Sequence, residues 1–262
     1  MSRRFAHVLI TGASSGIGAA LAQASAGPGV VLHLGGRDAG RLASVAERCR
    51  SLGAAAYPAR IDVRDASAMA EWIGGAGRLD LVVANAGVGA GTGHGCESPA
   101  DARTVFETNL TGALNTVLPA IAVMAAQPPG RDGWRGRVAV VSSLAAFIAA
   151  PSAPAYCASK AALQRWAEAR DATERRRGIR LHAICPGFVR TPMTARNPFP
   201  MPWLMTPEEA AQRILAGLAA GRRRIVFPWP LYALARLAGA LPQGLVHRLM
   251  EWLPPKPPLH AG

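Results

Sequence analysis

Short apolar runs alternate with amphipathic stretches along most of the chain. The apolar runs have strand length and are bounded by glycine or polar residues, whereas the stretches between them show the 3.6-residue repeat of a helix. The predicted strands are 6–10, 30–34, 54–61, 79–84, 138–141, 181–184 and 224–227. The predicted helices are 19–26, 41–52, one that starts at Asp65, one that starts at Ser98, 155–177, and one that starts at Pro207 behind the cap Thr206. Strands that alternate with helices in this way predict an α/β fold with a parallel, doubly wound sheet.

The last part of the chain departs from this alternation. Leu231, Leu234, Leu237 and Leu241 recur at helical spacing, and a second helical stretch contains Leu245, Val246, Leu249, Trp252 and Leu253. Prolines and Arg236 keep these stretches well short of the ~20 apolar residues of a spanning helix. We expect residues 1–228 to form one domain and 229–262 a helical, proline-rich extension of it. The extension is expected to pack on a cleft or a second subunit, or to touch a membrane surface peripherally, with residues 254–262 mobile.

A glycine-rich turn joins the first predicted strand to the first helix. It reads Thr11-Gly12-Ala13-Ser14-Ser15-Gly16-Ile17-Gly18. Such a turn brings main-chain N–H groups and a helix N-terminus to a pyrophosphate, and its glycines permit tight turning and close approach of the ligand. The turn therefore predicts a Rossmann-type dinucleotide site, with Gly12, Ser14, Ser15, Gly16, Ile17 and Gly18 among its cofactor-binding residues.

The same residues also fit a second motif. Gly12 to Gly16 match G-x-S-x-G, the nucleophile elbow of serine hydrolases, which likewise lies on a strand-to-helix turn. Ser14 would then be a nucleophile, with His182, His247 or His260 as the base. This alternative leaves Gly18 and the tyrosine–lysine pair described below without a role.

The end of the second strand carries the residues expected to select the cofactor. Gly35-Gly36-Arg37-Asp38 follows the strand at the point where a Rossmann unit contacts the adenosine ribose. An acidic residue there indicates NAD, whereas an arginine accommodates the 2′-phosphate of NADP. Because Arg37 comes first and Asp38 has the position of a helix cap, NADP(H) is favoured over NAD(H).

The most informative stretch is Tyr156-Cys157-Ala158-Ser159-Lys160. Tyr156 and Lys160 are four residues apart and share one face of a predicted helix. A cation beside a phenol favours the phenolate and lowers a pKa that is normally about 10. The chain has 29 basic residues, of which only Lys160 and Lys256 are lysines, so a lysine at this point is unusual for this composition.

Composition limits the other function classes. The formal net charge of +13 indicates solvated basic faces or attraction to anions. Aromatic residues do not interleave with the arginines as single-strand nucleic-acid binding requires, so no nucleic acid is expected.

The four cysteines are scattered through the chain at Cys49, Cys96, Cys157 and Cys185, and the histidines do not have the spacing of metal ligands. This pattern predicts reduced thiols and no metal. The run behind the basic start is too short for a signal peptide, so we expect a cytoplasmic protein.

Taken together, the motifs resemble the classical short-chain dehydrogenases/reductases over about residues 5–227. The matching residues are the loop from Thr11 to Gly18, Asp62, Asn85-Ala86-Gly87, Asn109, Ser143, Tyr156, Lys160, and Pro186-Gly187-Phe188-Val189-Arg190-Thr191. Ser143 stands thirteen residues before Tyr156, as is usual in this family.

The resemblance implies an NADP-dependent oxidoreductase that interconverts a carbonyl and a secondary alcohol. In the reductive direction hydride passes from NADPH to the carbonyl carbon and Tyr156 donates a proton to the oxygen. Ser143 would hold that oxygen, Lys160 would bind the ribose and lower the pKa of Tyr156, and Asn109 would support a water that connects Lys160 to solvent.

The resemblance also implies the remaining cofactor contacts. Asp62 and Val63 would contact the adenine, and Asn85, Ala86 and Gly87 would line the cofactor. Thr191 and the Val189 backbone would bind the carboxamide, and Pro186 and Gly187 would also be cofactor-binding residues. A homodimer or homotetramer is expected from family habit. Phe147, Phe188, Phe199 and Trp203 suggest a lipophilic small-molecule substrate. A non-catalytic NADP-binding regulator on the same fold is the alternative, against which the complete set of Asn109, Ser143, Tyr156 and Lys160 argues.

Overall fold

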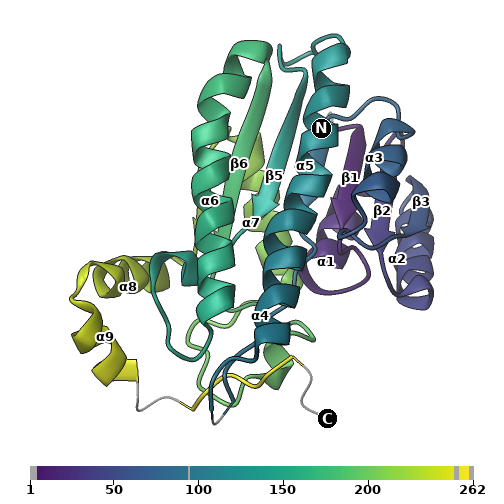
Figure 1. The fold of residues 1–262 in the computed structure, drawn as a ribbon. Coiled ribbons are helices and arrows are strands. Elements are labelled where there is room, and N and C mark those ends of the chain that lie inside the picture. Colours follow the sequence, from purple (N-terminus) through teal and green to yellow (C-terminus); the bar gives the residue numbers. More distant parts are fainter. Residues whose placement is uncertain (1–4, 94, 251–253, 260–262) are drawn as a thin grey trace.

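The computed structural model describes residues 5–93, 95–250 and 254–259, and its centre is a parallel sheet. The sheet has seven strands in the order β3-β2-β1-β4-β5-β6-β7 (Figure 1). The strands are β1 His7–Thr11, β2 Val31–Gly36, β3 Ala55–Arg60, β4 Leu81–Ala84, β5 Gly136–Val141, β6 Ile179–Pro186 and β7 Arg224–Phe227. Each matches an apolar run identified in the sequence, so the predicted α/β doubly wound fold is confirmed.

Helices cover both faces of this sheet. They are α1 Gly16–Ser25, α2 Ala39–Ser51, α3 Ala66–Gly74, α4 Pro99–Phe106, α5 Gly112–Ala126, α6 Pro154–Glu174, α7 Pro207–Ala219, α8 Trp229–Ala240 and α9 Gln243–Met250. One apolar core lies between the sheet and α1, α2 and α7, and a second lies between the sheet and α3, α5 and α6. This arrangement is why β5 and β6 read as unbroken apolar runs, since every residue in them is buried.

Side-chain caps define where several helices begin. Asp38, Asp65, Ser98 and Thr206 each accept a hydrogen bond from a main-chain N–H three residues further on, at the starts of α2, α3, α4 and α7. Capping of this kind satisfies N–H groups that have no partner inside the helix. The first strand lies between β2 and β4, so the strand order reverses there and the carboxyl ends of β1 and β4 open a crevice for a ligand.

One long helical stretch, Pro99–Ala126, is long and apolar enough by length and composition to cross a membrane. It consists of α4, a π-helical turn Glu107–Thr111, and α5. Much of α5 is nevertheless buried in the core on the face of α3 and α6. Its apolar character is therefore explained by packing inside the domain.

The C-terminal extension leaves the sheet edge and returns to the opening of the crevice. Helix α8 packs on the short 3-10 helix Leu144–Phe147, where the rings of Tyr232 and Phe147 lie 5.1 Å apart. After α9 the chain runs as Pro254–Leu259 beneath α4 (Figure 1). Trp252 and Leu253 of the expected second helix lie outside the described residues.

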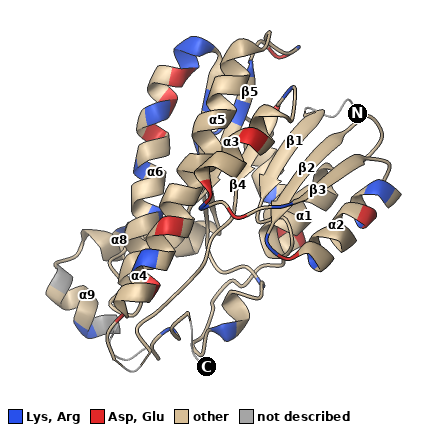
Figure 2. Cartoon of the chain, turned by 45° about the vertical axis from the view of Figure 1, so that its right-hand side comes forward, with Lys and Arg blue, Asp and Glu red and all other residues tan. Residues whose placement is uncertain are grey.

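Basic segments are spread over α2, α4 and α6 and alternate with acidic ones along α6 (Figure 2). Several are engaged in ion pairs, such as Arg170 and Arg177 with Glu174. The high net charge is thus distributed over several elements in this view.

Candidate active site

A cavity of about 810 Å³ lies along the carboxyl ends of the central strands. It is lined by nearly all of the residues that the sequence singled out: Gly12, Ser14, Ser15, Gly16, Ile17, Arg37, Asp62, Val63, Asn85, Ala86, Gly87, Ser143, Tyr156, Lys160, Pro186, Gly187, Val189 and Thr191. Among the predicted catalytic and cofactor-binding residues, Gly18 and Asn109 lie outside this lining, and so do the aromatic residues expected near the substrate, Phe147, Phe188, Phe199 and Trp203. Segments far apart in the sequence therefore converge on one crevice.

The glycine-rich turn has the conformation that a dinucleotide site needs. Gly12 and Gly16 have φ of 66° and 56°, a region that favours glycine. A Cβ on Gly16 would lie 2.8 Å from Thr191 Cγ2 on the opposite wall. Ser15 caps α1 without a side-chain hydrogen bond, so the first N–H groups of that helix remain free for an anion. These features fit the pyrophosphate of a nicotinamide dinucleotide.

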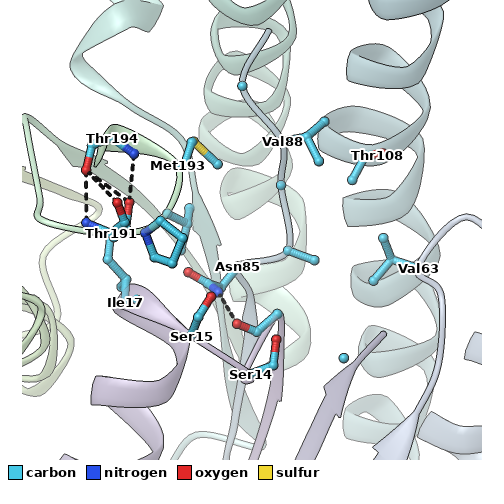
Figure 3. A pocket seen from close by; sticks show the side chains of 18 of the residues that line it. Ser14, Ser15, Ile17, Val63, Asn85, Val88, Thr108, Thr191, Met193 and Thr194 are labelled. Atoms are coloured by element: carbon cyan, nitrogen blue, oxygen red, sulfur yellow. Dashed lines mark hydrogen bonds between the residues drawn. The ribbon is translucent and has the colours of Figure 1, made fainter. Parts of the chain in front are cut away.

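Gly18, the last glycine of the turn, allows close packing of the turn against its neighbours. A Cβ on Gly18 would collide with the Gly12 carbonyl oxygen and lie 2.6 Å from Asn85 Nδ2. Asn85 Nδ2 donates to the carbonyl oxygens of Thr11 at 3.0 Å and Gly12 at 3.1 Å. The end of β4 is thereby fastened to the turn, and Figure 3 shows Asn85 above Ser14 and Ser15.

At the end of the cavity where the adenosine ribose is expected, the acidic residue Asp38 already has hydrogen-bond partners. Asp38 accepts from Arg41 N at 2.9 Å and from Arg41 Nε at 2.7 Å, which confirms its predicted place as the cap of α2. Arg37 is exposed, and its charge helps to lower the pKa of Asp62, after the larger effect of the Arg64 hydrogen bond. Arg41, which also lines the cavity, was not identified from the sequence.

Helix α6 brings Tyr156 and Lys160 to the cavity wall, where Lys160 is buried. Lys160 Nζ donates to the Val141 carbonyl oxygen at 2.8 Å and lies 5.9 Å from the centre of the Tyr156 ring. Burial, together with a smaller effect of the Lys256 charge, lowers the pKa of Lys160 to about 8.

The expected lowering of the Tyr156 pKa is wrong for this structure. Burial raises the pKa of Tyr156, and a hydrogen bond with the Ser143 side chain offsets only part of that effect. The physical reason is that the Lys160 ammonium is directed to the end of β5 instead of to the phenol. Tyr156 consequently carries its proton at neutral pH.

Asn109 lies behind the wall in the π-helical turn. Its Oδ1 accepts from Val88 N at 2.8 Å, and its Nδ2 donates to Val88 O at 3.0 Å and Ser159 Oγ at 3.2 Å. A Cβ on Gly87 would lie 3.0 Å from Asn109 Oδ1 and 3.3 Å from Lys160 Nζ. The amide thus fixes the loop after β4 at the point where it passes Lys160, which explains a polar residue in the middle of a helix.

The opposite wall is held by a threonine pair. Thr191 N donates to Thr194 Oγ1 at 2.9 Å, and Thr194 Oγ1 donates to the Val189 carbonyl oxygen at 2.6 Å (Figure 3). Met193 lines the cavity beside them. Thr194 was missed from the sequence, although two threonines three residues apart after a strand are a signal for such a turn.

The segment Pro254–Leu259, part of the terminus expected to be mobile, makes hydrogen bonds to the loops beside the cavity. Gly93 N donates to the Lys256 carbonyl oxygen at 2.9 Å, and Arg196 Nη2 donates to the Pro258 carbonyl oxygen at 2.7 Å. Four prolines leave this segment few conformations to lose on ordering, so a few hydrogen bonds suffice to hold it. Residues 260–262 lie outside the described chain.

Among the described residues, the serine-hydrolase alternative has no histidine in the cavity that Ser14 lines. None of the histidines in the described ranges lines the cavity, and His182 Nδ1 hydrogen-bonds to the Arg222 carbonyl oxygen at 2.6 Å. His260, the third candidate, lies outside those ranges. The geometry therefore favours the tyrosine-centred site.

Comparison with known proteins agrees with this geometry. A family model described as short chain dehydrogenase matches residues 6–199. An uncharacterized oxidoreductase of Myxococcus xanthus is 39% identical over 242 residues, which cover 90% of this chain and 93% of that protein. A short chain dehydrogenase from Burkholderia cenocepacia in complex with NADP has a TM-score of 0.78 at 26% identity, with 95% of this chain and 99% of that chain covered. A short chain dehydrogenase/reductase from Burkholderia phymatum in complex with NAD has a TM-score of 0.77 at 25% identity, with 91% and 94% covered.

Proposed function

The chain belongs to the short-chain dehydrogenase/reductase family and is an oxidoreductase that acts with a nicotinamide cofactor, and from this premise we propose that it reduces the carbonyl group of a lipophilic small molecule with NADPH. The observation that carries the proposal is that Ser143, Tyr156 and Lys160 line the same cavity, with Lys160 buried and donating to the Val141 carbonyl oxygen. The same groups can run the oxidation of a secondary alcohol in reverse.

The reaction needs a hydride and a proton. The glycine-rich turn and the segment from Pro186 to Thr191 would hold the reduced nicotinamide cofactor, which would supply the hydride for the carbonyl carbon. The carbonyl oxygen accepts hydrogen bonds from Ser143 Oγ and Tyr156 Oη, and the Tyr156 proton moves to it as negative charge develops there. The phenolate that remains is stabilised by the Lys160 ammonium and regains a proton from solvent before the next turnover.

The preference for NADPH is supported by the adenosine end of the cavity. Asp38 is occupied with the N-terminus of α2 and with Arg41, whereas Arg37 and Arg41 both line the cavity. The exposed guanidinium of Arg37 would attract a 2′-phosphate and gain little from a 2′-hydroxyl, whereas that of Arg41 is already paired with Asp38. Similar structures contain NADP or NAD, so we base the proposed preference on the residues of this chain alone.

A lipophilic substrate is supported by apolar groups after β6. Met193 lines the cavity, and the rings of Phe188 and Phe199, which lie outside its lining, are 6.1 Å apart. Trp203 is 49% exposed. These side chains could contact a hydrocarbon portion of the substrate.

The remaining expectations concern partners and location. Trp229, Leu234, Leu237 and Leu245 expose apolar side chains on α8 and α9, and we propose that a second copy of this chain covers them in a cytoplasmic homodimer or homotetramer. Peripheral membrane contact is the alternative. Sedimentation of the purified chain with and without liposomes distinguishes these two proposals.

The test of the function is NADPH consumption with a panel of aliphatic ketones and oxo acids, with the product identified by mass spectrometry. We expect consumption that depends on the carbonyl compound and yields the secondary alcohol. Tight NADPH binding without consumption by any member of the panel would favour the non-catalytic regulator instead.

A further inference from the structure

The segment Pro254–Leu259, here called the C-terminal strap, is attached to both sides of the crevice. Gly93 N, in the loop after β4, donates to the Lys256 carbonyl oxygen at 2.9 Å. Arg196, in the loop after β6, donates to the carbonyl oxygens of Pro258 at 2.7 Å and Leu259 at 3.3 Å. Asp101 of α4 accepts from Leu259 N at 3.0 Å. The strap therefore bridges the two loops that flank the reacting groups.

The sequence of the strap favours an extended course between the two loops. Pro254, Pro255, Pro257 and Pro258 enclose a single lysine, and such a run is stiff and extended without internal hydrogen bonds. A Cβ on Gly91 would collide with the Lys256 carbonyl oxygen, and a Cβ on Gly89 would lie 2.5 Å from Lys256 Nζ. The glycines of the loop after β4 thus make room for the strap.

Lys256 is placed beside the proton donor of the site. Its Nζ lies 4.2 Å from the centre of the Tyr156 ring, within cation–π distance. Leu259 packs in an apolar cluster with Tyr156 and Val88 and also lines the cavity. The strap therefore contributes to the wall around the reacting carbonyl.

This ammonium has no carboxylate partner among the described residues. The nearby acids are used elsewhere, since Asp101 accepts from Leu259 N and Glu97 accepts from Ala155 N at 3.2 Å. Burial lowers the pKa of Lys256 to about 8, and the Arg196 charge acts in the same direction. A half-buried cation near Lys160 and Arg196 is costly, and an anion supplied by a ligand would offset that cost.

We propose that Lys256 binds a carboxylate of the substrate and that the preferred substrates are oxo acids whose carboxylate lies a few bonds from the reacting carbonyl. This proposal rests on the proposed function. Because Lys256 lies against the Tyr156 ring, an anion that reaches its Nζ is close to the carbonyl that Tyr156 protonates. The two lysines of this arginine-rich chain then have different roles. Lys160 stabilises the phenolate of Tyr156, and Lys256 selects the substrate through its carboxylate.

The experiment compares NADPH-dependent reduction of aliphatic 3-oxo acids with that of their methyl esters. The variants are Lys256→Gln, which removes the charge, and Lys256→Arg, which keeps it. Arg213→Gln is the matched control because Arg213 is exposed on α7. We expect Lys256→Gln to lower kcat/KM for the acids about 10- to 100-fold, mainly through KM, and to change the ester values less than about 3-fold. Lys256→Arg should restore part of the loss.

A second readout needs no turnover. Hexanoate should change the fluorescence of NADPH bound to the wild-type protein, whereas hexanamide and the Lys256→Gln variant should show no such response. Equal losses for acids and esters, higher activity in Lys256→Gln, or equal binding of hexanoate and hexanamide would overturn the proposal. Failure of the wild-type protein to bind NADPH at all would instead refute the proposed function, so the two failures are distinguishable.

Discussion

Lys160 Nζ donates to the main-chain carbonyl of Val141 at 2.8 Å, which ties the middle of the site to the end of β5. Val141 is the last residue of that strand, and Ser143 follows two residues later. The same hydrogen bond thus fixes the position of Lys160 relative to the end of β5 and to the loop that carries Ser143. It also keeps the ammonium 5.9 Å from the centre of the Tyr156 ring, so that burial dominates the pKa of the phenol.

This arrangement predicts the pH dependence of reduction. Burial lowers the pKa of Lys160 to about 8, so the ammonium is present below that pH and is lost as the pH rises through it. The raised pKa of Tyr156 keeps the phenol protonated over the same range. We expect kcat/KM to be flat on the acidic side and to fall above about pH 8. Because Lys256 depresses the pKa of Lys160, Lys256→Gln should shift this fall to higher pH; an unchanged position would contradict the coupling.

The cofactor preference predicts a selective effect at Arg37. Removal of its guanidinium takes away a partner of the 2′-phosphate, so Arg37→Gln should weaken NADPH binding about 10- to 100-fold. NADH binding should change less than about 3-fold. Parallel fluorescence titrations measure both, with Arg48→Gln on the exposed face of α2 as the control. Equal weakening of the two cofactors would contradict the assignment.

The amide of Asn109 is predicted to act by positioning. Asn109→Ala removes both hydrogen bonds to Val88, which should loosen the loop after β4 and lower kcat about 10-fold or more. Asn109→Asp keeps an acceptor for Val88 N and should retain more activity. Amide hydrogen exchange of the loop provides a separate readout, and unchanged protection in Asn109→Ala would argue against this role.

Stability should depend strongly on Asp171, which is far from the cavity. It is buried, accepts from Leu181 N at 2.9 Å, and pairs with Arg180 at 3.4 Å and Arg223 at 3.3 Å. Asp171→Asn leaves the largely buried Arg180 without a countercharge, at a cost of roughly 3 kcal/mol in the free energy of unfolding. The exposed Glu47 is the control, because Glu47→Gln should change that free energy by less than about 0.5 kcal/mol. Urea titration measures both, and similar midpoints would contradict this view.

The strands and most helix starts were predictable because their signals are local. Buried parallel strands appear as apolar runs, and residues such as Asp38 and Thr206 mark helix starts through the bonds that they make. The lining of the cavity followed from the topology, since a parallel sheet brings the ends of distant strands to one edge. Gly18 lies outside the cavity lining, and the sequence could not distinguish its close packing from ligand contact because both require glycine.

The parts that could not be predicted depend on contacts between distant segments. A proline-rich terminus has no periodicity, so nothing local indicates that Lys256 returns to Tyr156. The spacing of Tyr156 and Lys160 places both on one helix face but does not say where the ammonium points. Its acceptor, the Val141 carbonyl, belongs to another element, and this choice reversed the expected direction of the tyrosine pKa.

The most direct test of the central claim is single-turnover NADPH oxidation by wild-type protein and by Tyr156→Phe, with a carbonyl compound that the wild type reduces. The variant loses only the phenol oxygen, so NADPH binding should stay within about 3-fold while the hydride-transfer rate falls by at least about 100-fold. That result would establish Tyr156 as the proton donor. A rate within about 3-fold of the wild type, with the cofactor bound equally well, would contradict the account.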